Sequence, residues 1–448
     1  MTSVFHRIPE RQLPVAVRGD GMYIYDKDGN RYIDSYAGGA CVSCLGHSQK
    51  AVIQAVQDQI GKMAFFHSAM FTSEPMEELA SILTTNAPEG LTRVFFTNSG
   101  SEAVETAVMM ARQYFVEIGQ PQRKKVISRR SSYHGAGLTG LGIGYHVARR
   151  TPFEEVLPSV FHISPCYEYR GRLEGETAAQ YGLRVANELE QAILGLGPDT
   201  IMAFVAETVT GTTAGATPAV PGYFKRIREI CDKYGVLLVL DEVFCGLGRT
   251  GTLHACEQDD VAPDFLAVAK GIAAGYQPIG ATLINEKIYD AIVSGSGTFK
   301  GGYTYSGHAT ACAAAVAVQR CLRAPGFLDD VIAVGSQLDS QLKDQFGHHP
   351  HVGDIRGRGM MMTLELVENR DTKVPFSPSR GLSSSIYRNA LSRGLITHAL
   401  TGTVDGHVGD HVVICPPLIA NSNDIDTIVG LLSEAINAAL SEGSAYAV

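Results

Sequence analysis

Short apolar runs alternate with helix-like stretches along most of the 448-residue chain. A short apolar run bounded by polar or turn residues is typical of a buried strand. Such runs predict strands at residues 94–96, 125–127, 201–206, 236–240 and 265–269. Residues 102–115 and 223–234, which lie between these runs, have helical composition. The alternation predicts an α/β fold with a mostly parallel central sheet flanked by helices.

The pattern changes after residues 324–326, Ala-Pro-Gly, where a helix-like stretch leads to the strand-like residues 360–366. Residues 22–30 read as a hairpin with an Asp-Gly-Asn turn. We predict a small α+β domain near the C-terminus and expect the N-terminal segment to join it. The predicted N-terminal segment, large domain and small domain cover residues 1–60, 61–324 and 325–448.

Charge and composition narrow the class of protein. The 37 Lys and Arg against 46 Asp and Glu give a net charge of −9, which argues against nucleic acid as the main partner, because a phosphate backbone requires clustered positive charge. The longest apolar stretch, residues 309–318, is shorter than the roughly 20 residues of a membrane span. Residues 1–14 contain no apolar core of a secretory signal. We therefore expect a cytoplasmic protein that binds neither nucleic acid nor a membrane.

The nine cysteines include one C-x-x-C pair, Cys41 and Cys44, with His47 three residues on. A structural zinc site requires a fourth ligand at a matching spacing, and the sequence shows no second cluster. We therefore interpret these cysteines as packed or free thiols and predict no metal site.

Three charged residues, Glu207, Asp241 and Lys270, directly follow apolar runs. In open α/β sheets, ligands bind at the carboxyl ends of the strands. A charged side chain in such a place is costly to bury without a partner. Burial favours the neutral amine of a lysine, which is the form that reacts with an aldehyde to give a Schiff base. The alternative is that Lys270 only extends to solvent at the rim of the sheet.

The pair Asp241-Glu242 after an apolar run also matches the Walker B pattern of ATPases. That function requires a G-x-x-x-x-G-K-[ST] loop. The only Gly-Lys pair, Gly61-Lys62, is followed by Met63, so the ATPase hypothesis fails. A buried aspartate without a metal still favours a cationic partner, and a pyridinium nitrogen is one.

Residues 97–102, Thr-Asn-Ser-Gly-Ser-Glu, lie between a predicted strand and a predicted helix. Backbone N–H groups and hydroxyls at a helix N-terminus can hold a phosphate. An ordinary serine cap with a glutamate in the first turn explains the same residues.

Residues 135–140 match the dinucleotide pattern G-x-G-x-x-G. Residues 131–134 intervene between the preceding strand and this motif, and residues 153–156 do not resemble the end of a second strand, which disfavours NAD binding. Tyr133 and His134 can instead form an aromatic platform for a flat ring, with ordinary packing as the alternative.

Taken together, these residues resemble the class III (ω-amino acid type) aminotransferases, which use pyridoxal 5′-phosphate on the type I fold. The resemblance spans nearly the whole chain. The motifs that carry it are residues 40–47, Ser99–Ala103, Tyr133–Gly135, Glu207, Leu240–Val243, Gly246–Gly251, Ala269–Gly271, Tyr303–His308 and Cys415–Leu418.

The resemblance implies a role for each matching residue. Lys270 would form the Schiff base with the cofactor and carry a proton between the substrate carbon and the cofactor. Asp241 would keep the pyridine nitrogen protonated, and Glu207 would help to position Asp241. Val243 and Tyr133 would contact the two faces of the ring, with His134 also at the cofactor.

The phosphate would be bound by Ser99, Gly100 and Ser101, with Thr304 contributed by the partner subunit of a homodimer. Arg249 would pair with a glutamate near the substrate entrance, or would form a purely structural ion pair.

The sequence departs from familiar branches of the family. The branch similar to 4-aminobutyrate aminotransferases has an arginine where this chain has Ala136, and residues 394–448 contain no Lys or Arg where many amine transaminases keep a mobile arginine. Both departures remove a bidentate carboxylate contact. Ala40 replaces a bulky aromatic residue, which predicts a wide entrance. The candidates to replace the missing arginine are His398, His407, Arg149 and Arg150.

We therefore predict a pyridoxal-phosphate aminotransferase with a ping-pong mechanism. An amine or ω-amino acid would donate the amino group, and a small 2-oxo acid such as pyruvate or 2-oxoglutarate would accept it. One alternative is another reaction on the same fold, by an aminomutase or a phospho-lyase. The other is a non-catalytic binding protein.

Overall fold

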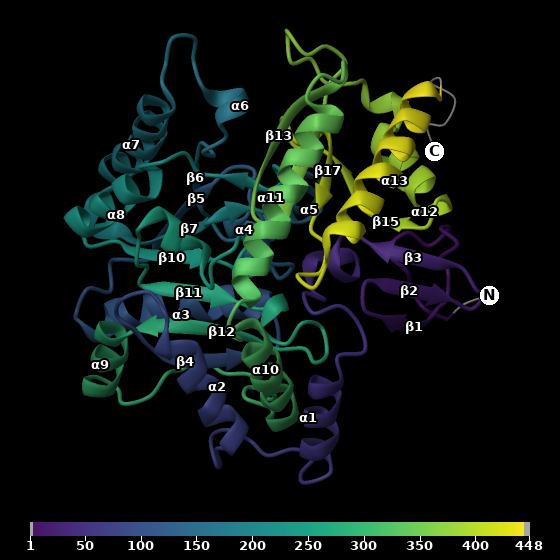
Figure 1. Cartoon of the computed structure of the whole chain (residues 1–448). Coiled ribbons are helices and arrows are strands. Elements are labelled where there is room, and N and C mark those ends of the chain that lie inside the picture. The colour runs from purple at the N-terminus through teal and green to yellow at the C-terminus, as the bar shows by residue number, and fades with distance from the viewer. Residues whose placement is uncertain (1–2, 443–448) are drawn as a thin grey trace.

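The structure is a computed structural model that describes residues 3–442. At its centre lies a seven-stranded sheet in the order β4-β12-β11-β10-β7-β5-β6 (Figure 1). β12 is antiparallel to β11 and β4, and the other neighbours are parallel, which confirms the predicted sheet. The strands are β4 (Leu91–Thr97), β5 (Lys125–Arg129), β6 (Phe161–Ile163), β7 (Ile201–Glu207), β10 (Leu237–Asp241), β11 (Phe265–Val268) and β12 (Gly280–Asn285).

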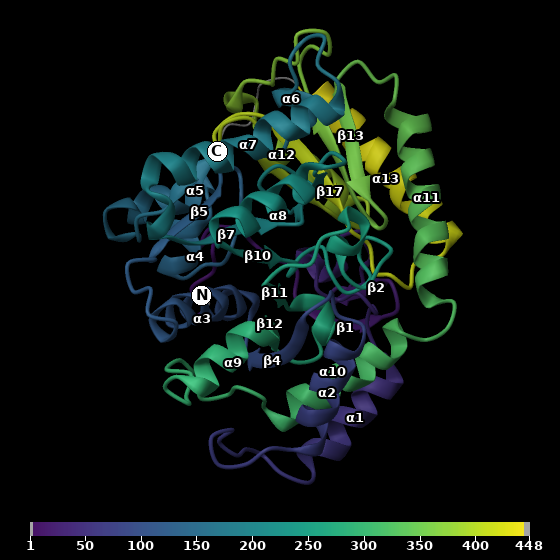
Figure 2. The ribbon, with the colours of Figure 1, turned by 90° about the vertical axis from the view of Figure 1, so that its left-hand side faces the viewer.

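Helices cover both faces of this sheet, as Figure 2 shows for β10 and β11. Alternate residues of a strand point to opposite faces: Val205 and Val239 pack with α3 and α9, whereas Phe204 and Leu238 pack with α7 and α8. Every residue of β7, β10 and β11 is buried, which explains their uninterrupted apolar sequences. The helices are α3 (Gly100–Glu117), α7 (Ala178–Leu196), α8 (Tyr223–Tyr234) and α9 (Glu286–Ser294).

An antiparallel sheet in the order β13-β14-β17-β16 lies toward the C-terminus. The predicted strand over residues 360–366 corresponds to β14, and helices α11, α12 and α13 pack around the sheet. The elements are β13 (Val352–Arg358), β14 (Met361–Leu366), β16 (His398–Thr401), β17 (Asp410–Ile414), α11 (Phe327–Phe346), α12 (Leu382–Ser392) and α13 (Ser422–Ser441).

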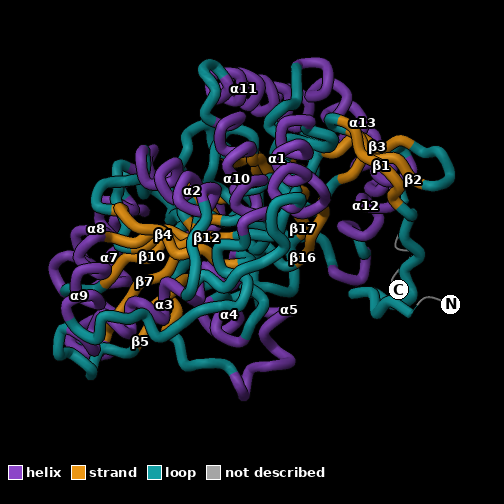
Figure 3. Tube along the Cα trace, turned by 90° about the horizontal axis from the view of Figure 1, so that it is seen from below, coloured by secondary structure: helices purple, strands orange, loops and turns teal. Residues whose placement is uncertain are grey.

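The N-terminal strands share a sheet with residues near the other end of the chain. The predicted hairpin is confirmed by antiparallel pairing of β2 with β3, and β15 pairs parallel to β3 through Leu395 and Ile33. Figure 3 shows β1, β2 and β3 beside α12 and α13. These strands are β1 (Ala16–Asp20), β2 (Tyr23–Asp26), β3 (Arg31–Asp34) and β15 (Leu395–Ile396).

The remaining helices and a short hairpin complete the fold. α1 (Lys50–Ile60) and α2 (Glu74–Thr85) pack against α10 (Ala309–Leu322). The short elements are α4 (Leu138–Ile143), α5 (Val147–Arg150), α6 (Glu168–Gly171), β8 (Val209–Thr210) and β9 (Thr217–Pro218). None of the helices within residues 3–442 is long and apolar enough to cross a membrane.

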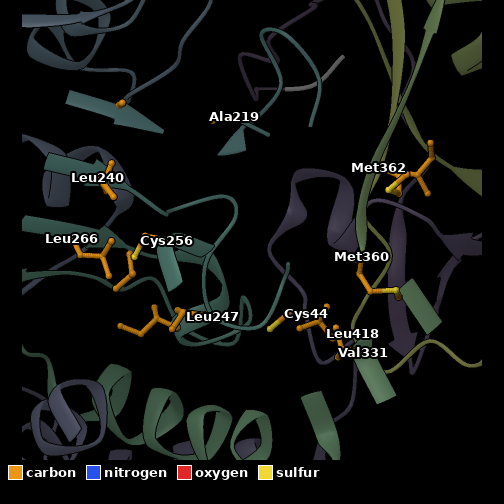
Figure 4. Close-up of a cluster of buried hydrophobic side chains, with 14 of the residues drawn as sticks. Cys44, Ala219, Leu240, Leu247, Cys256, Leu266, Val331, Met360, Met362 and Leu418 are labelled. Carbon is orange, nitrogen blue, oxygen red and sulfur yellow. The ribbon is translucent and has the colours of Figure 1, made fainter. Parts of the chain in front are cut away.

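One hydrophobic cluster connects the central sheet to the C-terminal part of the chain (Figure 4). Leu240 and Leu266 of the central sheet belong to the same cluster as Val331 of α11, Met360 and Leu418. The predicted division at residues 60 and 324 stays a prediction, because this packed core runs across it.

Candidate active site

A cavity of about 610 Å³ lies at the carboxyl ends of β7, β10 and β11. Most of the site residues predicted from the sequence line it; Thr304, Arg249, Arg150 and His407 do not. Those that line it are Ala40, Ser99, Gly100, Ser101, Tyr133, His134, Arg149, Glu207, Asp241, Val243, Lys270 and His398.

Lys270 follows β11 and is half-buried. Its Nζ lies 4.7 Å from the centre of the Phe244 ring. Its φ of 43° is left-handed, a conformation that costs a residue with a Cβ about 1 kcal/mol. Surrounding packing must impose such strain, and strained residues cluster at functional sites. The structure thus holds a lysine amine in a defined place within the cavity.

Asp241 ends β10 with a buried carboxylate. Its Oδ2 lies 2.8 Å from Nδ1 of His134, and its Oδ1 accepts a hydrogen bond from the Val243 amide at 3.0 Å. Within residues 3–442, no lysine or arginine nitrogen lies within 4.0 Å of this carboxylate. A buried carboxylate that faces a cavity without such a partner is suited to a cationic ligand group, such as a protonated ring nitrogen.

Glu207 is the neighbour of Asp241 across the pair β7 and β10. Its two carboxylate oxygens accept hydrogen bonds from the amides of Tyr133 (3.2 Å) and Gly211 (2.7 Å). Burial raises the pKa of Glu207, and the nearby His134 opposes that shift. Glu207 therefore ties the segment that carries Tyr133 to the floor of the cavity.

The loop between β4 and α3 lies on one side of the cavity. Ser99 caps α3, because its Oγ accepts a hydrogen bond from the Glu102 amide at 3.2 Å. Ser101 accepts one from the Ala136 amide, also at 3.2 Å. Free amides at this helix N-terminus and the two hydroxyls are ligands that suit a phosphate, so the cap and a phosphate site are compatible.

Two glycines permit close approach at this loop. A Cβ on Gly100 would lie 2.5 Å from Cγ1 of Val243, and a Cβ on Gly135 would lie 2.9 Å from Cβ of Ser101. Gly135 also has a φ of +125°, which L side chains rarely adopt. The two glycines therefore let Val243 and Ser101 pack directly against the backbone beside the cavity.

Tyr36, Ala40 and His398 also line the cavity, together with two arginines, Arg7 and Arg149. Ala40 and Arg7 are exposed, so we call this part of the lining the opening of the cavity. The rings of Tyr36 and His398 stack with centres 4.7 Å apart. Burial lowers the pKa of His398 to about 4, assisted by the positive charges of Arg149 and Arg7. His398 is therefore uncharged at neutral pH.

The structure places Arg249 and Thr304 outside this cavity. Arg249 is buried, and its guanidinium donates hydrogen bonds to the carbonyls of Met360, at 3.0 Å, and Pro416. This place differs from the expected one at the substrate entrance, because a buried guanidinium requires acceptors and finds them in backbone near β14 and β17. Thr304 is exposed.

Several lining residues were absent from the sequence prediction, among them Arg7, Tyr36, Thr212 and Phe244. Phe244 directly follows the predicted Val243, and Tyr36 follows β3 by two residues, so strand ends could have indicated both. No local pattern marks Arg7, which reaches the site only through the tertiary fold.

These residues fit pyridoxal 5′-phosphate. The buried carboxylate of Asp241 suits the ring nitrogen, Val243 held tightly against Gly100 suits contact with the face of a flat ring, and Ser99 and Ser101 suit a phosphate.

Comparisons with known proteins agree. Residues 7–436 match the family model described as Aminotransferase class-III. An uncharacterized aminotransferase of Schizosaccharomyces pombe is 42% identical over 434 residues, which cover 97% of this chain and 94% of the relative. A putrescine–pyruvate aminotransferase of Pseudomonas aeruginosa is 34% identical over 97% of this chain and 92% of its own length.

Solved structures of similar fold also include transaminases. The ω-transaminase of Pseudomonas jessenii, in complex with PMP, superposes with a TM-score of 0.89 at 34% sequence identity, over 95% of this chain and 93% of that one. PMP is the aminated form of pyridoxal phosphate. The chain therefore belongs to the class III aminotransferases, enzymes that use pyridoxal 5′-phosphate on the type I fold.

Proposed function

We propose that this enzyme moves an amino group from an amine or ω-amino acid to a 2-oxo acid, pyruvate or 2-oxoglutarate, by a ping-pong mechanism. The observation that carries the proposal is that Lys270 and Asp241 line the same cavity. Arg7 and Arg149 line its opening, together with the exposed Ala40. The name of the Pseudomonas aeruginosa relative, with an amine donor and pyruvate, supports this substrate class.

Asp241 would hold a proton on the pyridine nitrogen. Bound pyridoxal phosphate then supplies an electron sink for the carbon that loses its proton. Contacts of His134 and the Val243 amide with the two carboxylate oxygens orient Asp241. Glu207, bonded to the Tyr133 amide, would keep Tyr133 at the ring.

Lys270 would act as the base and the acid of the reaction. Its Nζ would take the proton from the substrate carbon that bears the amino group and would deliver it to the cofactor. Val243, packed tightly against Gly100, would contact one face of the ring, and the loop of Ser99 and Ser101 would bind the phosphate.

We also propose a homodimer in which Thr304 reaches the phosphate of the partner's site. Thr304 is exposed and does not line the cavity of its own chain. The adjacent Tyr305 is 58% exposed and contacts the ring of Phe65, which is 44% exposed. Exposed aromatic residues of this kind are common at interfaces between subunits. A cytoplasmic location stays a prediction.

The test is a matrix of donors and acceptors with the purified holoenzyme. Putrescine, 4-aminobutyrate, β-alanine and 1-phenylethylamine would each be paired with pyruvate and 2-oxoglutarate, and both products would be quantified. One amino acid formed per donor consumed supports the proposal. Isomerised donor or released phosphate without consumption of the oxo acid would favour an aminomutase or a phospho-lyase. No change in any donor would favour a binding protein.

A further inference from the structure

The opening of the cavity carries two arginine side chains that come from distant parts of the sequence. Arg7 belongs to the N-terminal segment and is exposed, whereas Arg149 lies on α5 and is half-buried. Both line the cavity that contains Lys270. The guanidinium carbon of Arg149 lies 4.9 Å from the centre of the Tyr133 ring, so an aromatic face supports this side chain within the site.

Neither guanidinium has an acidic partner. Within residues 3–442, no carboxylate oxygen lies within 4.0 Å of the side chain of Arg7 or Arg149. The acidic residues that line the cavity, Glu207 and Asp241, are buried at its floor and hold other contacts. The opening therefore carries positive charge that the chain does not neutralise, and an anionic ligand would neutralise it.

The other residues that the sequence suggested as replacements for the missing arginine are excluded by their surroundings. His398 lines the cavity, but burial and the two arginines lower its pKa to about 4, so the imidazole is neutral. The guanidinium of Arg150 lies over the Tyr145 ring at 4.5 Å and donates to the Gly144 carbonyl. His407 is exposed, and neither Arg150 nor His407 lines the cavity.

We propose that Arg149, assisted by Arg7, binds the carboxylate of the 2-oxo acid substrate. The planar guanidinium of Arg149 offers two parallel N–H donors to the two carboxylate oxygens. An amine donor without a carboxylate requires no such contact, so one opening serves both substrates of the exchange. The inference rests on the proposed function, because it assigns the acceptor site of that reaction.

The first experiment measures binding without turnover. Pyruvate is titrated by calorimetry into the holoenzyme in its aldehyde form, which has no amino group to give. A charge-assisted hydrogen bond contributes about 1.5–3 kcal/mol, and 1.4 kcal/mol is tenfold in affinity. We expect Arg149→Met to weaken binding about tenfold or more, Arg149→Lys to weaken it less, and Arg7→Met to weaken it about threefold.

The matched control is Arg150→Met, which removes the neighbouring guanidinium of the same helix. We expect it to change pyruvate affinity less than about twofold, because Arg150 does not line the cavity. Wild-type affinity in Arg149→Met, or an equal loss in Arg150→Met, would overturn the assignment.

A second measurement separates a specific loss from a damaged site. The reaction of 1-phenylethylamine with the aldehyde form, followed by absorbance, involves no carboxylate, so Arg149→Met should lower its rate far less than it lowers pyruvate affinity. If the variant loses this reaction as well, its role is structural and the inference fails. If the wild type itself exchanges no amino group with any donor, the proposed function fails, while the pyruvate titration still reports on Arg149.

Discussion

At the scale of single residues, the proposed function depends on charged groups that the fold holds at strand ends. Lys270 and Asp241 follow the apolar strands β11 and β10, so their backbones are fixed by the sheet while their side chains face the cavity. The left-handed φ of Lys270 and the two contacts of Asp241 leave little freedom in either place. Substitution of each residue therefore tests its chemistry.

Lys270→Ala should abolish amino transfer, with a loss of at least about a thousandfold in kcat. The absorbance of the covalently attached cofactor should also disappear, because Lys270 is the only lysine among residues 3–442 that lines the cavity. Lys270→Arg retains the charge and cannot form a Schiff base, so it should be equally inactive. A variant with wild-type absorbance and turnover would contradict the role of Lys270.

Asp241→Asn should lower kcat by about a hundredfold or more, since a neutral amide does not stabilise a protonated ring nitrogen. The amide is nearly isosteric, so thermal unfolding of the apoprotein should change little. Near-normal turnover in a variant that binds the cofactor would refute the role of this carboxylate.

His411 of β17 gives a prediction about stability and pH. Burial, assisted by the charge of Arg356, lowers the pKa of His411 to about 3. Its ring contacts Thr403 and donates to the Thr212 carbonyl. A folded pKa below the unfolded value of about 6.5 stabilises the fold above pH 6.5, and this stability is lost as pH falls toward 3.

The measurement compares the wild type with His411→Asn by denaturant unfolding. Groups other than His411 titrate alike in both proteins, so the difference isolates this histidine. The stability advantage of the wild type should shrink by about 2 kcal/mol between pH 7.5 and pH 5. An advantage that stays constant over this range would show that His411 titrates normally.

At the scale of elements, apolar runs predicted the central strands well. The predicted strands within β4, β5, β7, β10 and β11 are confirmed, as are the helices within α3 and α8. β12 escaped prediction because its few apolar residues are interrupted by Thr282 and bounded by Gly280 and Asn285, and one of its pairing partners, β4, lies far away in sequence. Neighbours in the sheet, which no local pattern reports, make this segment a strand.

The loop between β4 and α3 gives a prediction at this scale. Gly100→Ala would place a Cβ 2.5 Å from Val243, which must displace Val243 or the loop that carries Ser99. We expect the dissociation constant of pyridoxal phosphate to rise about tenfold, a change of 1.4 kcal/mol, measured by equilibrium dialysis.

Gly430→Ala is the matched control, because Gly430 lies in α13 with no atom within 4 Å of an added Cβ. An alanine in an open helical position stabilises by about 0.5–1 kcal/mol and should leave cofactor affinity unchanged. Equal affinity in both variants would show that the space at Gly100 does not serve the cofactor.

At the scale of the whole molecule, the site depends on segments from both ends of the chain. β3 pairs with β15, and Tyr36 and His398, each two residues after the end of one of these strands, stack at the opening of the cavity. The opening is therefore built where the N-terminal strands meet the C-terminal part.

The proposed homodimer is tested at this scale. Sedimentation should give twice the mass of one chain. Tyr305→Glu should lower this mass toward that of a single chain, because the dimer would bury a charge at the interface. Leu173→Glu, at a residue of similar exposure (62% against 58% for Tyr305) and distant in sequence, is the control and should leave the mass unchanged. A wild-type monomer with full activity would refute the shared site.

The sequence by itself determined the sheet and the floor of the site. Strands end where apolar runs end, so the order of residues along the chain was sufficient to select Glu207, Asp241, Lys270 and the loop of Ser99 as candidate site residues. Only the tertiary structure decided what surrounds the substrate. It brought Arg7, Arg149 and His398 to one opening and turned Arg249 toward backbone carbonyls, because these places result from packing between distant segments.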